Sequence, residues 1–244
     1  MLMINLKAKR IFLFIINLLL TGCLPVFIAA GTELVPASDA KHDSIEKQIL
    51  YNGRAWRNLY SRIKGDQFLF SANLLNGTVT IGPRTFKNLL VKYDIYNDEI
   101  LTTTDHGIIL QLNKEMIDFF SINYDGKSYL FKRLDADSTN TLSGYVNVLY
   151  DSNISLYIKY RKEILLLAVE NKFDLFNQLH KIYLKKGGVI ILVNNRRDFL
   201  NQLKDHKQEV RSFIKSNKLK ITKKIPESFQ PVVEYYDRLQ YPKQ

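Results

Sequence analysis

The sequence predicts an α+β fold: an antiparallel β-meander or half-closed barrel followed by a short C-terminal helical segment. Short runs of β-branched and aromatic residues recur from residue 51 to residue 167, with turn-forming residues about every 8–15 positions. Apolar and polar residues alternate along several of these runs, which is the period of a half-buried strand. After residue 195 the apolar residues take helical spacing.

Several turns and strands can be placed from local patterns. Gln67–Phe70 and Thr78–Ile81 are runs of β-forming residues, and Asn76-Gly77 between them favours a tight turn. Tyr124–Lys127 and Gly187-Gly188 predict two further hairpins. These signals indicate strands joined in chain order, as in a meander.

One predicted strand shows the alternation clearly. Lys92 and Asp94 lie on one side of it, and we expect Lys92 to face solvent and to tolerate substitution by Asp. The other side is apolar and should face a core, formed by Leu89, Val91, Tyr93 and Ile95.

Helical spacing characterises the C-terminal region. Pro226–Leu239 is expected to form a helix with Ser228 as its N-cap. Two earlier helices are indicated by apolar residues three and four positions apart, namely Phe199, Leu200 and Leu203, and then Val210, Phe213 and Ile214.

The first thirty residues have the layout of a secretory signal. Lys7, Lys9 and Arg10 precede a nearly unbroken apolar run over residues 11–20. A retained membrane anchor is the competing interpretation, because apolar character resumes over residues 24–30 and the whole stretch is about 20 residues long. A proline within it and small residues at its end favour a cleavable signal. We therefore expect an exported protein, periplasmic or associated with the outer membrane.

Two cleavage sites compete at the end of this signal. Residues 20–23 (Leu-Thr-Gly-Cys) resemble a bacterial lipobox, in which Cys23 would become the lipidated first residue of a lipoprotein. Residues 28–31 (Ile-Ala-Ala-Gly) resemble an ordinary signal-peptidase site. Cys23 is the only cysteine of the chain, which excludes a disulfide scaffold and a thiolate zinc site.

The chain therefore divides into four parts. Residues 1–30 are the expected export signal and residues 31–47 a polar tether. Residues 48–194 form the β-rich body, and residues 195–244 form a basic helical segment docked on it.

Charge is distributed unevenly along the chain. The net charge is +11, and residues 181–244 carry 15 basic and 6 acidic side chains, a net charge of +9. Lys207, Arg211, Lys215 and Lys218 are predicted to form a patch for an anionic envelope partner: a lipid headgroup, lipopolysaccharide or an acidic protein. A solvated helical face is the other interpretation. Nucleic acid is not an expected partner, because no recognised reading motif accompanies the charge.

Motifs for catalysis and for cofactor binding are absent from the sequence. It contains no Gly-x-Ser-x-Gly elbow, P-loop or Gly-x-Gly-x-x-Gly. The histidines His42, His106, His180 and His206 are too far apart for a zinc motif. We therefore expect no catalytic residues, no cofactor and no metal site, and a protein that is not an enzyme.

Two alternatives to a binding or scaffolding role remain open. The first is a lipocalin-like carrier of an apolar ligand within the β body. Lipocalins begin their barrel with Gly-x-Trp, whereas Gly53–Trp56 here is one residue too long. The 14 Tyr and 14 Phe residues could line a cavity, but half-buried sheets use the same residues. The second alternative is an unrecognised hydrolase, which a His–carboxylate pair in a cleft would favour.

Three segments, Lys92–Ile100, Gly144–Asp151 and Phe199–Leu219, resemble a family of exported envelope proteins of the Bacteroidota. The similarity extends from about Tyr51 to Leu239. No activity is assigned to that family, so the resemblance implies export and residence in the envelope and nothing catalytic. The leading expectation is a non-enzymatic exported envelope protein with a binding or scaffolding role.

Overall fold

The computed structural model describes residues 48–136, 142–166 and 173–242. The predicted export signal, the predicted tether and Cys23 therefore lie outside the described residues.

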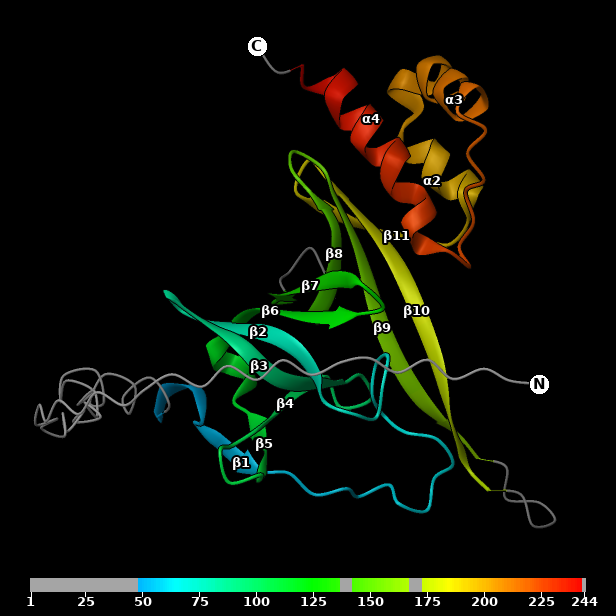
Figure 1. Cartoon of the computed structure of the whole chain (residues 1–244). Helices are drawn as coiled ribbons and strands as arrows, with labels where there is room; N and C mark the ends of the chain where they lie inside the picture. Colours follow the sequence, from blue (N-terminus) through cyan, green and yellow to red (C-terminus); the bar gives the residue numbers. More distant parts are fainter. Residues whose placement is uncertain (1–47, 137–141, 167–172, 243–244) are drawn as a thin grey trace, which may run out of the picture.

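Eleven strands form one open antiparallel sheet (Figure 1). No pairing between the two edge strands closes it among the described residues, so the α+β meander is confirmed and the sheet is not a closed barrel. In spatial order the strands are β1 (Gly53–Ala55), β5 (Ile109–Leu112), β4 (Glu99–Thr103), β3 (Arg84–Asp94), β2 (Leu75–Ile81), β6 (Ile117–Tyr124), β7 (Lys127–Leu134), β8 (Gly144–Asp151), β9 (Ser155–Leu165), β10 (Leu175–Lys186) and β11 (Val189–Val193).

Two of the predicted hairpin turns have the expected geometry. Asp125 and Gly126 join β6 to β7 with φ values of 49° and 70°. Gly187 and Gly188 join β10 to β11 with φ values of 57° and 82°. Two-residue turns with positive φ match the right-handed twist of the flanking strands, and glycine adopts such φ values without strain.

The turn predicted at Asn76-Gly77 is wrong, because both residues lie inside β2. A Cβ at Gly77 would overlap the carbonyl oxygen of Ser121 on β6, so glycine serves a close approach of two strands. The register of β2 against β3 shifts just after Gly77. Gln67–Phe70 forms no strand and contributes only an isolated bridge from Phe68 to Asp94.

The strand β3 is buried on both sides near its end. Val91, Tyr93 and Ile95 enter the core as expected. Lys92 is also buried, which corrects the prediction that it faces solvent: its Nζ lies 4.5 Å from the centroid of the Phe68 ring and donates to the Ala72 carbonyl at 2.9 Å. The segment that precedes β2 covers this side of the strand, so substitution of Lys92 by Asp would not be silent.

The helices of the C-terminal region follow the last strand and lie at one end of the sheet, beside β10 and β11, whereas the short helix Lys114–Met116 lies between β5 and β6 (Figure 1). The α-helices are α2 (Arg196–Gln202), α3 (Lys207–Ser216) and α4 (Gln230–Gln240), and the 3-10 helices are η1 (Lys114–Met116), η2 (Lys204–His206) and η3 (Pro226–Phe229). Ser228 is not the N-cap of α4, because its hydroxyl accepts from the Thr222 N–H and donates to the Ile225 carbonyl. No helix among the described residues has both the length and the apolar character needed to cross a membrane.

Two large hydrophobic cores share the sheet with a smaller cluster of Leu142, Val146 and Tyr157. The first fills the β body and includes Phe120 and Phe131, whose rings stack with centroids 4.6 Å apart. The second lies between strands β8–β11 and the helices, and is formed by residues including Leu156, Ile182, Leu184, Val193, Phe199, Val210, Val233 and Tyr236. The helices are therefore packed on the sheet through a continuous apolar interface.

Candidate functional site

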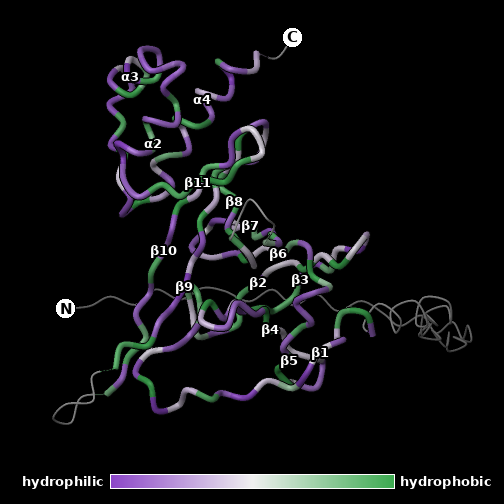
Figure 2. The backbone as a smooth tube through the Cα atoms, turned by 180° about the vertical axis from the view of Figure 1, so that it is seen from behind, coloured by the Kyte–Doolittle hydropathy of each residue, from purple (hydrophilic) through white to green (hydrophobic). Residues whose placement is uncertain are grey.

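The helix α3 is amphipathic, with basic residues on one side and buried apolar residues on another. Lys207, Arg211 and Lys215 are four residues apart and so lie along one side of a helix with 3.6 residues per turn. Val210 and Ile214 are buried in the second core. Figure 2 shows hydrophilic and hydrophobic stretches side by side in α2 and α3.

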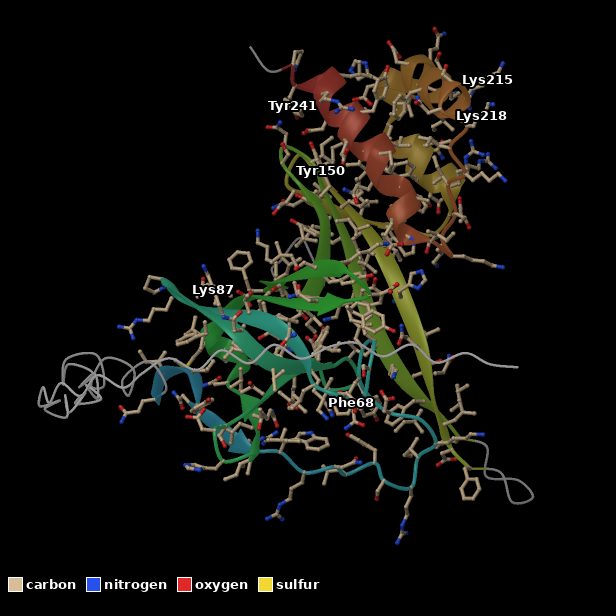
Figure 3. The ribbon with its side chains drawn as sticks, in the orientation of Figure 1. Phe68, Lys87, Tyr150, Lys215, Lys218 and Tyr241 are labelled. Atoms are coloured by element: carbon tan, nitrogen blue, oxygen red, sulfur yellow. The ribbon has the colours of Figure 1, made fainter. Side chains whose placement is uncertain are left out.

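The end of α3 adds a fourth basic residue. Lys218 follows the helix with φ 51°, and the Leu219 N–H donates to the Ile214 carbonyl at 3.0 Å. This left-handed residue terminates the helix and turns the chain back. Figure 3 places Lys215 and Lys218 at the outer side of α3, away from the sheet.

These four residues line a groove of about 990 Å³ between α2 and α3. The volume lies at the upper end of the range of small-molecule sites, about 300–1,000 Å³. Among the described residues that line it, none is acidic and seven are basic, namely Arg196, Arg197, Lys204, Lys207, Arg211, Lys215 and Lys218.

The floor of the groove is apolar. It is formed by Leu200, Leu203, Val210, Ile214 and Leu219. Three of these side chains are buried in the second core, and Leu200 and Leu219 are half-buried. The groove thus combines exposed cations with apolar residues, and the helices that carry the cations are held in place because several of the apolar residues pack in the second core.

A polar cluster fixes the helices to the sheet beside this groove. Lys186 on β10 donates to Asp205 and to the Gln202 carbonyl, both at 3.0 Å, and the Tyr236 hydroxyl donates to the same carboxylate at 2.5 Å. Burial would lower the pKa of Lys186, but the neighbouring Tyr236 and Asp205 raise it above its usual value. Asp205 is therefore neutralised by its partners and leaves the groove's charge uncancelled.

The structure brings the four predicted patch residues together and adds three more cations. These are Lys204, which begins the short helix η2 just before α3, and Arg196 and Arg197, which were not predicted because they lie on α2. Their helical spacing to Leu200 could have indicated them. Other basic residues of the tail, Lys220, Lys223 and Lys224, do not line the groove.

The carboxylates near the turn after β3 form hydrogen bonds and ion pairs that stabilise the fold. Asp98 accepts from Lys114 at 2.6 Å, from Lys159 at 2.9 Å and from the Tyr93 hydroxyl at 2.5 Å. Burial alone would raise the pKa of Asp98, but Lys159, Lys114 and Tyr93 lower it below its usual value. Asp94 accepts hydrogen bonds from the backbone of the turn. Each oxygen of Asp98 is thus engaged in holding the fold together.

No histidine within the described residues is among those that line the groove. His206 Nδ1 is 3.9 Å from Glu209, beyond hydrogen-bond distance, and His180 Nε2 contacts the Lys223 carbonyl at 2.7 Å. His106 is exposed. Within the described ranges, no group of three or more His, Cys, Asp or Glu residues could hold a metal ion.

Aromatic side chains occupy the interior of the β body. Tyr93, Phe120, Phe131 and Tyr145 are each at most 1% exposed and contact one another edge-to-face or stacked. Trp56 follows the edge strand β1, and its ring lies 5.9 Å from that of Phe68.

Comparisons with models of known families, with curated proteins and with solved structures found no match.

Proposed function

We propose that this chain is a non-enzymatic, exported envelope protein that binds an anionic envelope component in the groove between α2 and α3. The observation that carries the proposal is the composition of the groove's wall, where all seven charged residues are basic. A cationic concavity concentrates anions and strengthens each contact with them. The signal-like residues 1–30 support an envelope location.

The geometry favours a held ligand over a merely solvated surface. A solvated helical face carries mixed or scattered charge, whereas here two helices contribute cations to one concave site. The groove is lined by three arginines, Arg196, Arg197 and Arg211. A guanidinium group can donate two parallel hydrogen bonds to two oxygens of one phosphate or carboxylate. A carrier of an apolar ligand inside the β body is less well supported, because aromatic rings fill that interior.

The first prediction concerns the charge of the groove. We expect replacement of Lys207, Arg211, Lys215 and Lys218 by Gln to leave the thermal midpoint unchanged and to weaken binding to anionic vesicles at least tenfold at low salt. Each Lys or Arg near an anionic membrane surface contributes about 1 kcal/mol to the free energy of binding. The measurement is co-sedimentation with phosphatidylcholine vesicles that contain one quarter phosphatidylglycerol.

A charge-matched variant serves as the control. Lys87, Lys127, Arg161 and Lys181 are exposed on the sheet, and their replacement by Gln removes the same charge outside the groove. This variant should bind nearly as well as the parent. Pure phosphatidylcholine vesicles measure binding that does not depend on lipid charge, such as that by the apolar run over residues 11–20, and Lys7, Lys9 and Arg10 are the same in every variant. If the two fourfold variants lose binding equally, net charge alone is responsible and the proposed groove function is wrong.

A further inference from the structure

A second hollow adjoins the basic groove. It has a volume of about 810 Å³ and lies between the β10–β11 hairpin and α2. Asn201 and Lys204 line both hollows, so one ligand could extend from the first into the second.

One wall of the second hollow is the edge strand β11. Val189 and Ile191 line it, and they share a face because side chains alternate along a strand. The next residue of that face, Val193, is buried in the second core. Val189 is 53% exposed, which leaves apolar surface open to a ligand.

The second hollow carries less charge than the first. Its acidic residue, Asp205, is paired with Lys186 at 3.0 Å and accepts from the Tyr236 hydroxyl, which leaves Lys204, shared with the basic groove, as its unpaired cation among the lining residues. The two hollows therefore differ in character: the first is strongly cationic, and the second offers apolar side chains beside a neutralised ion pair.

We infer that the ligand is an anionic amphiphile whose phosphate headgroup lies in the basic groove and whose acyl chain lies along Val189 and Ile191. This inference rests on the proposed function and names its ligand class. A phosphate monoester carries between one and two negative charges and three acceptor oxygens, which suits seven clustered cations. An acidic peptide carries its charge along its length and would not match a site with separate cationic and apolar ends.

The second prediction tests whether the second hollow binds the acyl chain. We expect isothermal titration calorimetry of the full chain to show affinity rising from butyl to octyl to dodecyl phosphate, all below micelle concentration. Each methylene that enters the hollow should strengthen binding by up to about fourfold, since its burial contributes about 0.8 kcal/mol. Val189→Ser with Ile191→Ser should weaken dodecyl phosphate binding at least tenfold and leave butyl phosphate binding unchanged.

Leu192→Ser provides the matched control, because Leu192 is 37% exposed on the opposite face of the same strand. It should bind every alkyl phosphate as the parent does. Residues 1–30 are identical in all variants, so alkyl binding by them cancels in the comparison. If the double variant unfolds, Val189→Ser alone carries the test, because its side chain is already half exposed.

The outcomes separate this inference from the proposed function. Equal affinity for butyl and dodecyl phosphate would overturn the amphiphile while leaving anion binding intact. Unchanged binding of both by the fourfold groove variant would overturn anion binding in the groove. If dodecanoate binds as tightly as dodecyl phosphate, the inferred phosphate headgroup is wrong. If hexaglutamate binds more tightly than dodecyl phosphate, the ligand is an acidic peptide and the inferred amphiphile is wrong.

Discussion

A single carboxylate joins several elements of the β body. Asp98 lies in the turn between β3 and β4 with φ 60°, a left-handed conformation that Asp and Asn tolerate better than most residues. Its oxygens accept from Lys114 of η1, Lys159 of β9 and Tyr93 of β3. Its position is further restricted by Gly144, where a Cβ would overlap the carboxylate.

The third prediction concerns this carboxylate. We expect Asp98→Asn to destabilise the protein by about 3 kcal/mol at pH 7, because the buried Lys159 and the half-buried Lys114 lose their counter-charge while the backbone remains unstrained. The pKa of Asp98 is lowered in the folded state, so its stabilisation is present above the unfolded pKa of about 3.9 and is lost as pH falls below it. Urea unfolding of parent and variant from pH 7 to pH 3 should therefore show their difference shrinking. A difference that stays constant to pH 3 would contradict the ion-pair account.

Among the strands, β2 shows how one residue sets the distance between neighbours. It pairs with β3 on one side and with β6 on the other, and both partners lie close to Gly77. A Cβ there would overlap the Ser121 carbonyl and lie 2.7 Å from a methyl group of Val91. The central strands can therefore reach their observed separation only with glycine at this position.

The fourth prediction follows from this packing. Gly77→Ala should destabilise the protein by about 3 kcal/mol, since the added methyl must displace backbone of a central strand. Gly82→Ala is the control: nothing lies within 4 Å of an added Cβ there, and only its φ of 54° opposes alanine. We expect a loss of about 1 kcal/mol for Gly82→Ala, measured by thermal unfolding. A smaller effect at Gly77 than at Gly82 would mean that β2 and β6 separate easily.

Taken as a whole, the molecule has two large cores placed one after the other along one face of β9. Leu156 packs in the core beneath the helices, whereas Ile158 and Tyr160 on the same face pack in the core of the β body. Figure 1 shows β9 and β10 extending from the β body to the helices. The groove is therefore positioned by the same long strands that complete the β body.

The fifth prediction tests this dependence. A chain that ends at Asn195 should unfold at lower urea than the full chain, because Leu156, Ile182, Leu184 and Val193 lose their apolar cover. Burial of each such side chain contributes roughly 1.5–3 kcal/mol. A chain that ends at Gln240 keeps every helix and should match the parent. Identical midpoints for all three chains would show that the helices do not support the sheet.

Local patterns were sufficient for the class of fold and for part of the groove. Alternation and turn residues predicted the antiparallel meander, and Asp125-Gly126 and Gly187-Gly188 predicted two hairpins, because such signals depend only on neighbours in the chain. Lys207, Arg211 and Lys215 could be grouped in advance because one helix carries all three.

Contacts between distant segments decided the rest. The alternation along β3 places Lys92 on the side expected to face solvent, yet the segment that precedes β2 buries it. Gly77 follows an asparagine as in a tight turn, yet strands on both sides make it a packing residue. Arg196 and Arg197 line the same groove as Lys215 only because the chain turns between α2 and α3. Spacing along a sequence determines which side of an element a residue occupies, whereas the path of the chain determines what lies opposite that side.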